Sequence, residues 1–167
     1  DALTGMFNHK YFHDSHEREM LYSQRKEESL TIMMADIDSF KAVNDNYGHQ
    51  AGDMVLQKIS SNIIKACRSH DTVSRYGGEE FGIILPETGI EKSTRVAERI
   101  LDAVSSNPYP PVAQNITISI GIASFPEHAK DREDLIQKAD LALYHSKEKG
   151  KNRFTIYDGT LDPDTKH

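Results

Sequence analysis

The sequence predicts an α+β domain in which helices flank a mixed β-sheet of ferredoxin-like order. Hydrophobic periodicity gives the element order α-β-α-α-β-β-α-β-α-β, in which helices separate a central strand, a hairpin and a further strand. The run at residues 30–35 is almost continuously apolar, as in a strand that is buried on both faces. Two adjacent glycines, Gly77 and Gly78, separate two short strand patterns, which is typical of a hairpin.

The composition fits one domain with a proper core and excludes several classes of protein. The chain has 167 residues, 28% of them charged, and a net charge of −6. This acidic balance argues against a general binder of nucleic acid or of anionic membranes, and no apolar run is long enough to span a bilayer. The single cysteine, Cys67, rules out an internal disulfide and fits a reducing compartment, so we expect a cytoplasmic protein.

The start of the chain shows no signal peptide and opens abruptly at Asp1. We therefore expect a piece of a longer protein that also contains an upstream regulatory domain. Whether that missing region anchors the protein to a membrane stays open. The catalytic domain is expected over residues 1–157, followed by a polar tail at 158–167.

In the first half of the chain, a helix is expected over residues 7–28, where apolar positions recur among charged ones. The central strand follows, and a short helix begins at Ser39 and is broken at residues 46–49. A longer amphipathic helix is expected over residues 50–67. Its inner side is predicted to consist of Val55, Leu56, Ile59, Ile63 and Ile64.

The second half of the chain contains the hairpin, a further helix and strand, and a final helix and strand. The expected strands are 71–74, 80–85, 116–123 and 154–157, and the expected helices are 90–105 and 131–149. Gly150 is the expected C-cap of the last helix. The second hairpin strand has Phe81, Ile83 and Leu85 on one face and Glu80, Gly82 and Ile84 on the other.

Acidic residues cluster at chain segments that this topology brings together. The central strand ends at Asp36, and Glu79 and Glu80 follow the two glycines. In a ferredoxin-like sheet the end of the first strand lies beside the hairpin turn, so Asp36 is expected next to both glutamates. Three carboxylates make a hard oxygen site that suits Mg²⁺. Gly77 and Gly78 can take φ > 0 and leave the backbone bare, so that a large ligand can lie on it.

Simpler interpretations of these residues remain open. Gly-Gly turns are common, and acids that follow a turn are usually solvated. Asp38 lies two positions after Asp36, and the alternative role for both is to cap the helix that begins at Ser39. That role is less favoured for Asp36, because an acid that ends an apolar strand needs a partner.

Phosphate-binding groups follow the same segments. The turn after Asp38 opens onto a helix N-terminus, where free N–H groups can hold phosphate oxygens. Basic residues surround Gly150, namely Lys147, Lys149, Lys151 and Arg153. They are suited to phosphate binding, although a solvated basic helix end that complements the helix dipole is the alternative. A metal, phosphate ligands and a backbone cradle together are typical of nucleotidyl transfer.

At this point the motifs resemble the GGDEF domain of diguanylate cyclases, in its Gly-Gly-Glu-Glu-Phe form at residues 77–81. The resemblance covers nearly all of residues 1–157. Its further blocks are residues 1–5 with Asn8, 36–41, 44–45, 47–49 with 52–53, 75–76, 119–123, 139–144, 147 and 150–153. His9 departs from the arginine that is common in the opening motif. The implied fold is like the palm of polymerases and class III nucleotide cyclases, which agrees with the predicted topology.

The resemblance implies an enzyme that condenses two GTP into cyclic di-GMP and two pyrophosphates. Asp36 and Glu79 would hold Mg²⁺ or Mn²⁺, with the carbonyl of Ile37 as a further ligand and with Glu80 assisting at the metal. Glu79 would also accept the proton of the 3′-hydroxyl that attacks the α-phosphorus of the other GTP.

The resemblance also implies substrate contacts. Asn44 and Asp53 would bind the guanine edge, where a carboxylate accepts from N–H groups and an amide serves the purine edge. The alternatives are a helix cap for Asn44 and a solvated first-turn acid for Asp53. His49 would lie near the ribose or base. The remaining substrate positions are the amides of Phe40 and Lys41, the bare backbone of Gly77 and Gly78, and the side chains of Lys147 and Lys151.

A second motif, Arg68-Ser69-His70-Asp71, precedes the hairpin and has R-x-x-D spacing. The resemblance implies an inhibitory site for the product there. Arg68 would grip a guanine and a phosphate of cyclic di-GMP, for which its fork is suited, and Asp71 would accept from guanine. Arg99 is a candidate contact from a second subunit. A surface ion pair of little energetic value is the alternative for Arg68 and Asp71.

The expected partners are GTP, cyclic di-GMP and a second copy of the domain, because each active site would hold one GTP. We expect weak dimerisation and low activity for the isolated domain, and no nucleic acid or direct membrane contact. Three rival functions are a degenerate domain that only binds GTP or cyclic di-GMP, a palm-type enzyme with another product, and a structural scaffold. The presence of Asp36, Glu79 and Glu80 argues against the first.

Overall fold

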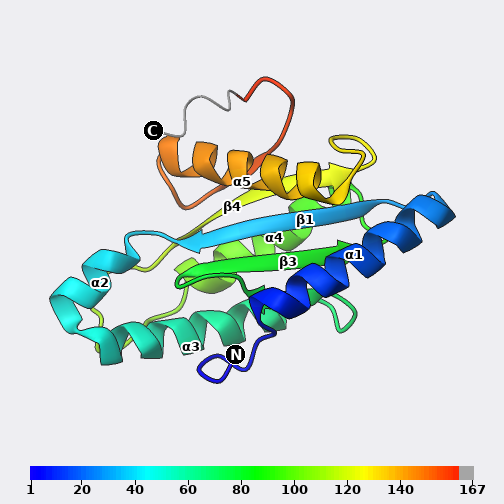
Figure 1. The fold of residues 1–167 in the computed structure, drawn as a ribbon. Coiled ribbons are helices and arrows are strands. Elements are labelled where there is room, and N and C mark those ends of the chain that lie inside the picture. The colour runs from blue at the N-terminus through cyan, green and yellow to red at the C-terminus, as the bar shows by residue number, and fades with distance from the viewer. Residues whose placement is uncertain (162–167) are drawn as a thin grey trace.

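The computed structural model describes residues 1–161 and contains a five-stranded mixed sheet (Figure 1). The strand order is β2-β3-β1-β4-β5; β4 and β5 run parallel, and the other neighbouring pairs are antiparallel. The strands are β1 (Leu30–Ile37), β2 (Thr72–Arg75), β3 (Glu80–Pro86), β4 (Ile118–Phe125) and β5 (Phe154–Ile156). This is the predicted ferredoxin-like order, with β5 added at one edge. Residues 162–167 of the predicted tail lie outside the described part.

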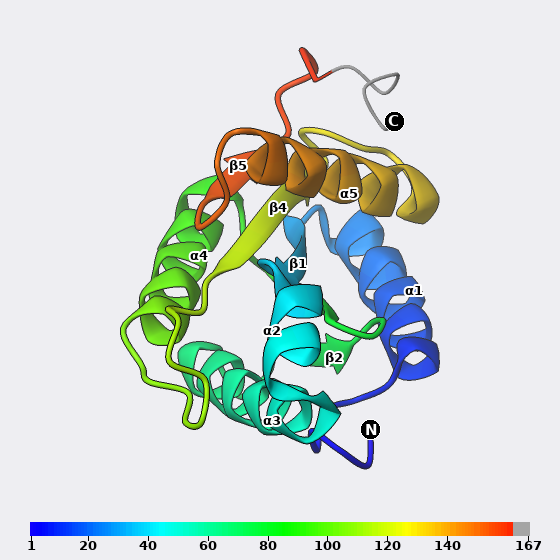
Figure 2. The same ribbon diagram turned by 90° about the vertical axis from the view of Figure 1, so that its left-hand side faces the viewer.

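Helices cover both faces of the sheet, and one short helix lies at its end. The helices are α1 (His9–Lys26), α2 (Phe40–Tyr47), α3 (His49–Ala66), α4 (Ile90–Ser105) and α5 (Arg132–Glu148). Figure 2 shows α1 and α5 on one face and α3 and α4 on the other, with α2 in front of the end of β1. No helix in the described part of the chain is both long and apolar enough to cross a membrane.

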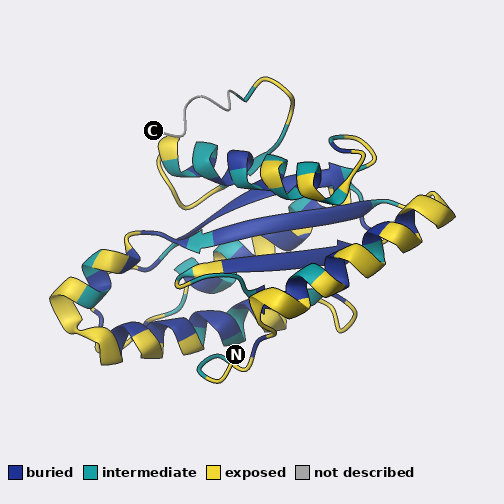
Figure 3. Cartoon of the chain, viewed as in Figure 1, coloured by how far each residue is buried: buried dark blue, intermediate teal, exposed yellow. Residues whose placement is uncertain are grey.

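The central strand is buried on both faces, as its apolar run predicted (Figure 3). Met33, Ala35 and Ile37 pack into the core on the side of α3 and α4, whereas alternate residues pack into a second core under α1 and α5. The residues of that second set are Leu30, Ile32 and Met34. Asp36 continues the second set, so its side chain belongs to the face that α1 and α5 cover.

Two glycines allow α1 and α5 to approach the sheet closely. Gly82 in β3 and Gly121 in β4 both lie opposite Met34 in the central strand. A Cβ atom on Gly82 would stand 2.6 Å from the ring of Phe12, and one on Gly121 would stand 2.1 Å from the backbone of α5. This row lies two residues before Asp36, so both helices are seated directly behind the end of β1.

The element bounds differ from the sequence prediction by a few residues. The first helix begins at His9 because Asn8 is its N-cap, with a side chain that accepts a hydrogen bond from the Tyr11 amide. The fourth strand begins at Ile118 rather than at residue 116. Ile64 was predicted to face inward but is 45% exposed, because it lies beside the stripe through Val55 and Ile59.

Candidate active site

The end of β1 and the start of β3 bring the predicted acids together. Asp36 lies opposite Glu80 in the antiparallel register, and the amide of Ile37 donates to the carbonyl of Glu79 at 3.2 Å. Opposite residues of an antiparallel pair have side chains on the same face of the sheet. The predicted proximity of Asp36 to both glutamates is therefore confirmed.

The ammonium group of Lys147, near the end of α5, lies among the oxygens at this corner. Its Nζ is 2.5 Å from Oδ1 of Asp36 and 3.4 Å from the carbonyl oxygens of both Asp36 and Ile37. Helix α5 packs closely over Gly121, where its residue Leu143 makes the contact. Lys147 is one helical turn after Leu143, so this packing brings the lysine to the corner. Lys147 thus forms an ion pair with Asp36.

The same oxygens fit a divalent cation. A positive charge already lies against a carboxylate and two carbonyl oxygens, and Mg²⁺ and Mn²⁺ prefer oxygen ligands of these kinds. In residues 1–161 no three acidic, histidine or cysteine side chains stand together as a metal site. A cation at this corner would therefore use the Ile37 carbonyl in addition to carboxylates.

Asp38 does not cap α2, which corrects one of the alternatives left open by the sequence. Its buried carboxylate accepts hydrogen bonds from the hydroxyls of Thr117 and Ser119 at 2.7 and 2.6 Å. The amide of Asn152 and the ammonium of Lys147 donate to it at 3.0 Å each. Burial favours a higher pKa for Asp38, but these donors outweigh it and the pKa is lowered. Asp38 is thus an ionised anchor that joins β1, β4 and the segment after α5.

The other acids at this corner, Asp36, Glu79 and Glu80, have raised pKa values. Burial raises the pKa of Asp36, although the hydrogen bond from Lys147 opposes the increase. Burial also raises the pKa of Glu79 and Glu80, and the neighbouring charge of Asp36 raises both further. Like-charged carboxylates held side by side are a place where a cation or a proton is favoured.

The bend that follows β2 is built differently from the prediction. Neither Gly77 nor Gly78 has a positive φ angle. A Cβ atom on Gly77 would stand 2.5 Å from Oε2 of Glu80, the end of an exposed side chain, so a larger residue there would displace the Glu80 carboxylate. Arg75 holds the bend through two hydrogen bonds to the carbonyl of Gly78, at 2.9 and 3.1 Å, and pairs with the carboxylate of Asp1 at 3.3 Å. The opening loop is thereby tied to the bend.

The start of α2 lies directly after β1. Ser39 has a left-handed backbone with φ of 55°, which turns the chain into the helix. The first amides of a helix, here those of Phe40 and Lys41, have no acceptor within the helix and point outward. Lys151 donates to the hydroxyl of Ser39 at 3.1 Å, so a second lysine lies at this helix start.

The corner between α2 and α3 contains the predicted base-binding residues. A Cβ on Gly52 would stand 1.9 Å from Oδ1 of Asn44, so only glycine allows the Asn44 amide to lie there. Asp53 follows Gly52 and is exposed, as is His49 at the start of α3. The structure gives Asn44, Asp53 and His49 no contact with the carboxylates at the end of β1.

Comparison with known protein families identifies the family to which this fold belongs. A family model described as "Diguanylate cyclase, GGDEF domain" matches residues 1–153. The chain belongs to the GGDEF family. The structure has a TM-score of 0.89 with the GGDEF domain of DgcB from Caulobacter crescentus in complex with c-di-GMP, at 33% identity over 95% of this chain and 93% of that one. With the active GGEEF domain of a diguanylate cyclase from Vibrio cholerae the TM-score is 0.88, at 30% identity over 93% and 99%.

This GGDEF domain is also similar to longer proteins. Diguanylate cyclase A of Treponema denticola is 44% identical to it over 142 residues, which are 83% of this chain and 38% of that protein. The chain spans about a third of the length of the curated relatives that it matches.

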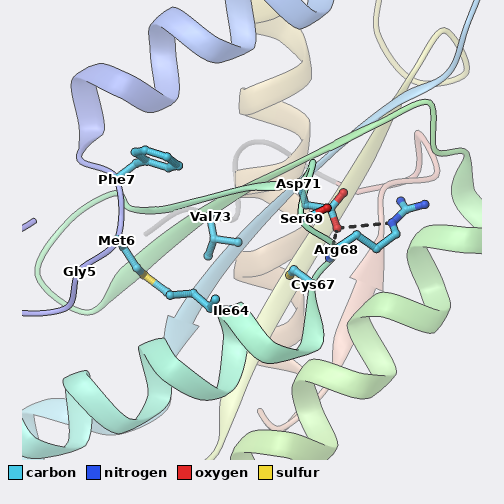
Figure 4. Close-up of a pocket in the computed structure, with 9 residues that line it drawn as sticks. All are labelled: Gly5, Met6, Phe7, Ile64, Cys67, Arg68, Ser69, Asp71 and Val73. Carbon is cyan, nitrogen blue, oxygen red and sulfur yellow. Dashed lines mark hydrogen bonds and ion pairs between the residues drawn. The ribbon is translucent and has the colours of Figure 1, made fainter.

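The R-x-x-D motif of this GGDEF domain lines a cavity of about 250 Å³ between the opening loop and the end of α3 (Figure 4). Asp71 accepts from the Arg68 amide at 2.7 Å, and the Arg68 side chain donates to the hydroxyl of Thr88 at 2.6 Å. The guanidinium of Arg68 also pairs with the buried Asp71 carboxylate at 3.5 Å, as the alternative interpretation predicted. Oδ1 of Asp71 is buried and accepts no hydrogen bond from the residues that the structure describes. Burial raises the pKa of the adjacent Cys67 to about 12, so this thiol is a poor nucleophile.

Arg99 of the GGDEF domain, predicted as a contact for a second subunit, makes a local contact in this structure. Its guanidinium donates to the carbonyl of Ala66 at 3.0 and 3.1 Å, where α3 ends. A cation at this place also complements the helix dipole.

Sequence reasoning missed several contacts of this GGDEF domain. It did not find the hydrogen bonds from Thr117 and Ser119 to Asp38, nor the Arg75 clamp on the bend. A signal was present for the first, since Thr117 and Ser119 alternate along one strand and place two hydroxyls on one face. No local pattern in the sequence pointed to the clamp.

Proposed function

We propose that this domain is a diguanylate cyclase that condenses two GTP into cyclic di-GMP and two pyrophosphates. The observation that carries the proposal is the meeting of Asp36 with Glu79 and Glu80 at a bend kept bare by Gly77. The names of the relatives support the same activity.

In the proposed reaction the 3′-oxygen of one GTP bonds to the α-phosphorus of the other. The bond from that phosphorus to the pyrophosphate oxygen breaks, and the hydroxyl proton passes to Glu79. The raised pKa of Glu79 supports this role, because a general base works best when its pKa is near the working pH. The same step on the second GTP closes the ring.

Asp36, Glu79 and the carbonyl of Ile37 would hold the metal ion, with Glu80 beside them. When bound, Mg²⁺ or Mn²⁺ supplies charge neutralisation at the phosphates and activation of the hydroxyl. Lys147 is poised to turn from Asp36 to a phosphate oxygen. Lys151, together with the amides of Phe40 and Lys41, would bind the remaining phosphate oxygens.

The guanine base would be recognised at the corner between α2 and α3. The exposed carboxylate of Asp53 can accept from the N1–H and 2-amino groups, and the Asn44 amide lies against Gly52, the residue before Asp53. Adenine lacks the 2-amino group and carries no N1–H, so it would leave Asp53 unpaired and be disfavoured. His49 would contact the ribose or base.

Cyclic di-GMP would bind as an inhibitor at Arg68 and Asp71, with Arg99 of a second domain as a further contact. The cavity that Arg68 and Asp71 line beside the opening loop supports this proposal. The DgcB domain with which this structure shares its fold is described in complex with c-di-GMP. Since each domain would bind one GTP, two copies must face each other for reaction.

The proposal is tested by incubating the chain with GTP and Mg²⁺ and separating the products by chromatography. We expect cyclic di-GMP from the wild type and about 10²-fold or greater loss in Glu79→Gln, which removes the base but keeps the shape. Glu98→Gln is the control, because Glu98 is exposed on α4, far along the chain from the site. GTP binding without product in the wild type would instead support a degenerate binding domain.

A further inference from the structure

Two histidines on the first turns of α1 stand in the position of a chelating pair. His9 and His13 are four residues apart on one helix, and their Nε2 atoms are 3.2 Å from each other. Residues at i and i+4 lie on the same helix face, so the helix itself fixes this spacing. His9 is exposed and His13 is half-buried, so solvent reaches the pair.

The distance between the nitrogens matches a shared metal ion. Two ligands at a Zn–N bond length of about 2.0–2.1 Å on a tetrahedral ion lie about 3.3–3.4 Å apart. The observed separation of the Nε2 atoms is 3.2 Å, so little side-chain movement is needed. Imidazole nitrogen suits zinc, copper and nickel ions, whereas Mg²⁺ prefers oxygen.

A third polar atom converges on the pair. The hydroxyl of Tyr76 is 3.2 Å from the same Nε2 of His13 that faces His9. One imidazole nitrogen has a single in-plane direction for a proton or a lone pair, so it cannot make good hydrogen bonds to both neighbours. A bound ion would take the lone pairs of both imidazoles and leave the Tyr76 hydroxyl to a water on that ion.

The charges and packing around the pair permit a cation. Burial lowers the pKa of His13, as do the nearby His9 and Arg132. Asp14 opposes Arg132 at this ring. The rings of His9 and Tyr76 also pack, with centroids 4.5 Å apart.

We propose that His9 and His13 bind a transition-metal ion of the zinc class through their Nε2 atoms, at the junction of α1 with the hairpin. The amide of Tyr76 donates to the carbonyl of Glu80 at 2.8 Å, so an ion here would secure α1 to the base of the hairpin. This site is separate from the oxygen-lined corner at Asp36 and takes a softer ion.

The test is a calorimetric titration of Zn²⁺ into the tag-free chain after chelator treatment, with excess Mg²⁺ to occupy oxygen-rich sites. Loss of an outer partner of a metal ligand already costs about 10–100-fold in affinity, so His9→Gln and His13→Gln should each weaken Zn²⁺ binding at least tenfold. His70→Gln is the control, because this exposed histidine lies outside the pair. Equal Zn²⁺ affinity in the wild type and both pair variants would overturn the proposal, as would no Zn²⁺ binding by the wild type.

A second measurement on the unmodified chain does not depend on the folding of any variant. Histidine ring resonances followed by NMR should shift on Zn²⁺ addition for His9 and His13, while those of His49 and His70 stay in place. Shifts confined to other histidines would overturn the proposal.

Discussion

At the scale of single residues, Lys147 connects the proposed catalytic corner to the stability of the fold. It donates to Asp36 and to Asp38, and the Asp38 side chain is only 4% exposed. Lys147→Met keeps the aliphatic stem but removes the charge. We expect the free energy of unfolding to fall by about 1.5–3 kcal/mol, the range for a hydrogen bond to a charged group, as measured by urea denaturation.

Lys149→Met provides the comparison for Lys147→Met, because Lys149 is exposed at the end of α5. A surface substitution of this kind should change the free energy of unfolding by less than about 0.5 kcal/mol. Equal losses in the two variants would show that the contacts of Lys147 contribute nothing specific.

His16 gives the fold a dependence on pH. The ring is fully buried in α1, neither ring nitrogen has a hydrogen-bond partner among the described residues, and burial lowers the pKa to about 3. Between pH 6.5 and 3 the unfolded chain binds a proton that the folded chain refuses, so stability falls as the pH falls. Between pH 7 and 5 this residue should cost about 2 kcal/mol in the free energy of unfolding.

His16→Leu tests this dependence, because leucine fills the site without a titratable group. Urea denaturation at pH 7 and pH 5 should show a smaller loss of stability in His16→Leu than in the wild type. His49→Gln should behave as the wild type does, since His49 is exposed at the start of α3. An unchanged difference between the two pH values in His16→Leu would refute the prediction.

At the scale of elements, the contact of α5 with β4 depends on Gly121. A Cβ there would stand 2.1 Å from both the carbonyl of Ala139 and the amide of Leu143, which are backbone atoms that cannot turn away. Gly121→Ala should therefore lift α5 and destabilise the domain by about 1–3 kcal/mol or more, as overpacking does. Because Lys147 lies on the same helix, cyclase activity should fall as well.

Thermal unfolding measures this effect, with Gly89→Ala as the matched variant. A Cβ on Gly89 would meet Ser29 only at 3.6 Å, an ordinary contact. Loss of the glycine at the N-cap of α4 should cost no more than about 1 kcal/mol. Wild-type stability in Gly121→Ala would mean that α5 adjusts without cost.

The elements differ in how well local sequence predicts them. The helix expected at residues 90–105 matches α4 because its apolar positions recur cleanly and polar residues fill the outer face. The bounds of α1 depend on the side chain of Asn8 and were missed by two residues at each end. The contacts of Asp38 join residues 79 and 114 positions apart, and no local pattern contains that information.

The candidate site, like the fold, was predicted only in part. Its acids come from strand ends, so the topology alone was enough to bring Asp36 near Glu79 and Glu80. The pairing of Lys147 with Asp36 was not predicted, because it requires the depth at which α5 packs over Gly121. The predicted positive φ at Gly77 and Gly78 was wrong, because the identity of a glycine permits a positive φ angle but does not impose one.

At the scale of the whole molecule, the proposed reaction requires two domains, each with one GTP. If the domains associate weakly, the fraction of paired domains falls with dilution by mass action. We expect cyclic di-GMP formation per milligram of protein to fall about tenfold on tenfold dilution in the weakly associated range. Constant specific activity, together with a monomer in analytical ultracentrifugation, would contradict the two-domain reaction.

The glycine row across the sheet has a consequence for anyone who redesigns this domain. Met34, Gly82 and Gly121 stand side by side, and the Phe12 ring fills the space above one of the glycines. Substitutions among residues that share a space are not additive, so these four positions should be varied as one unit rather than singly. At Gly82 a larger side chain needs a smaller residue at position 12, so libraries that vary such pairs together can change how α1 packs behind Asp36.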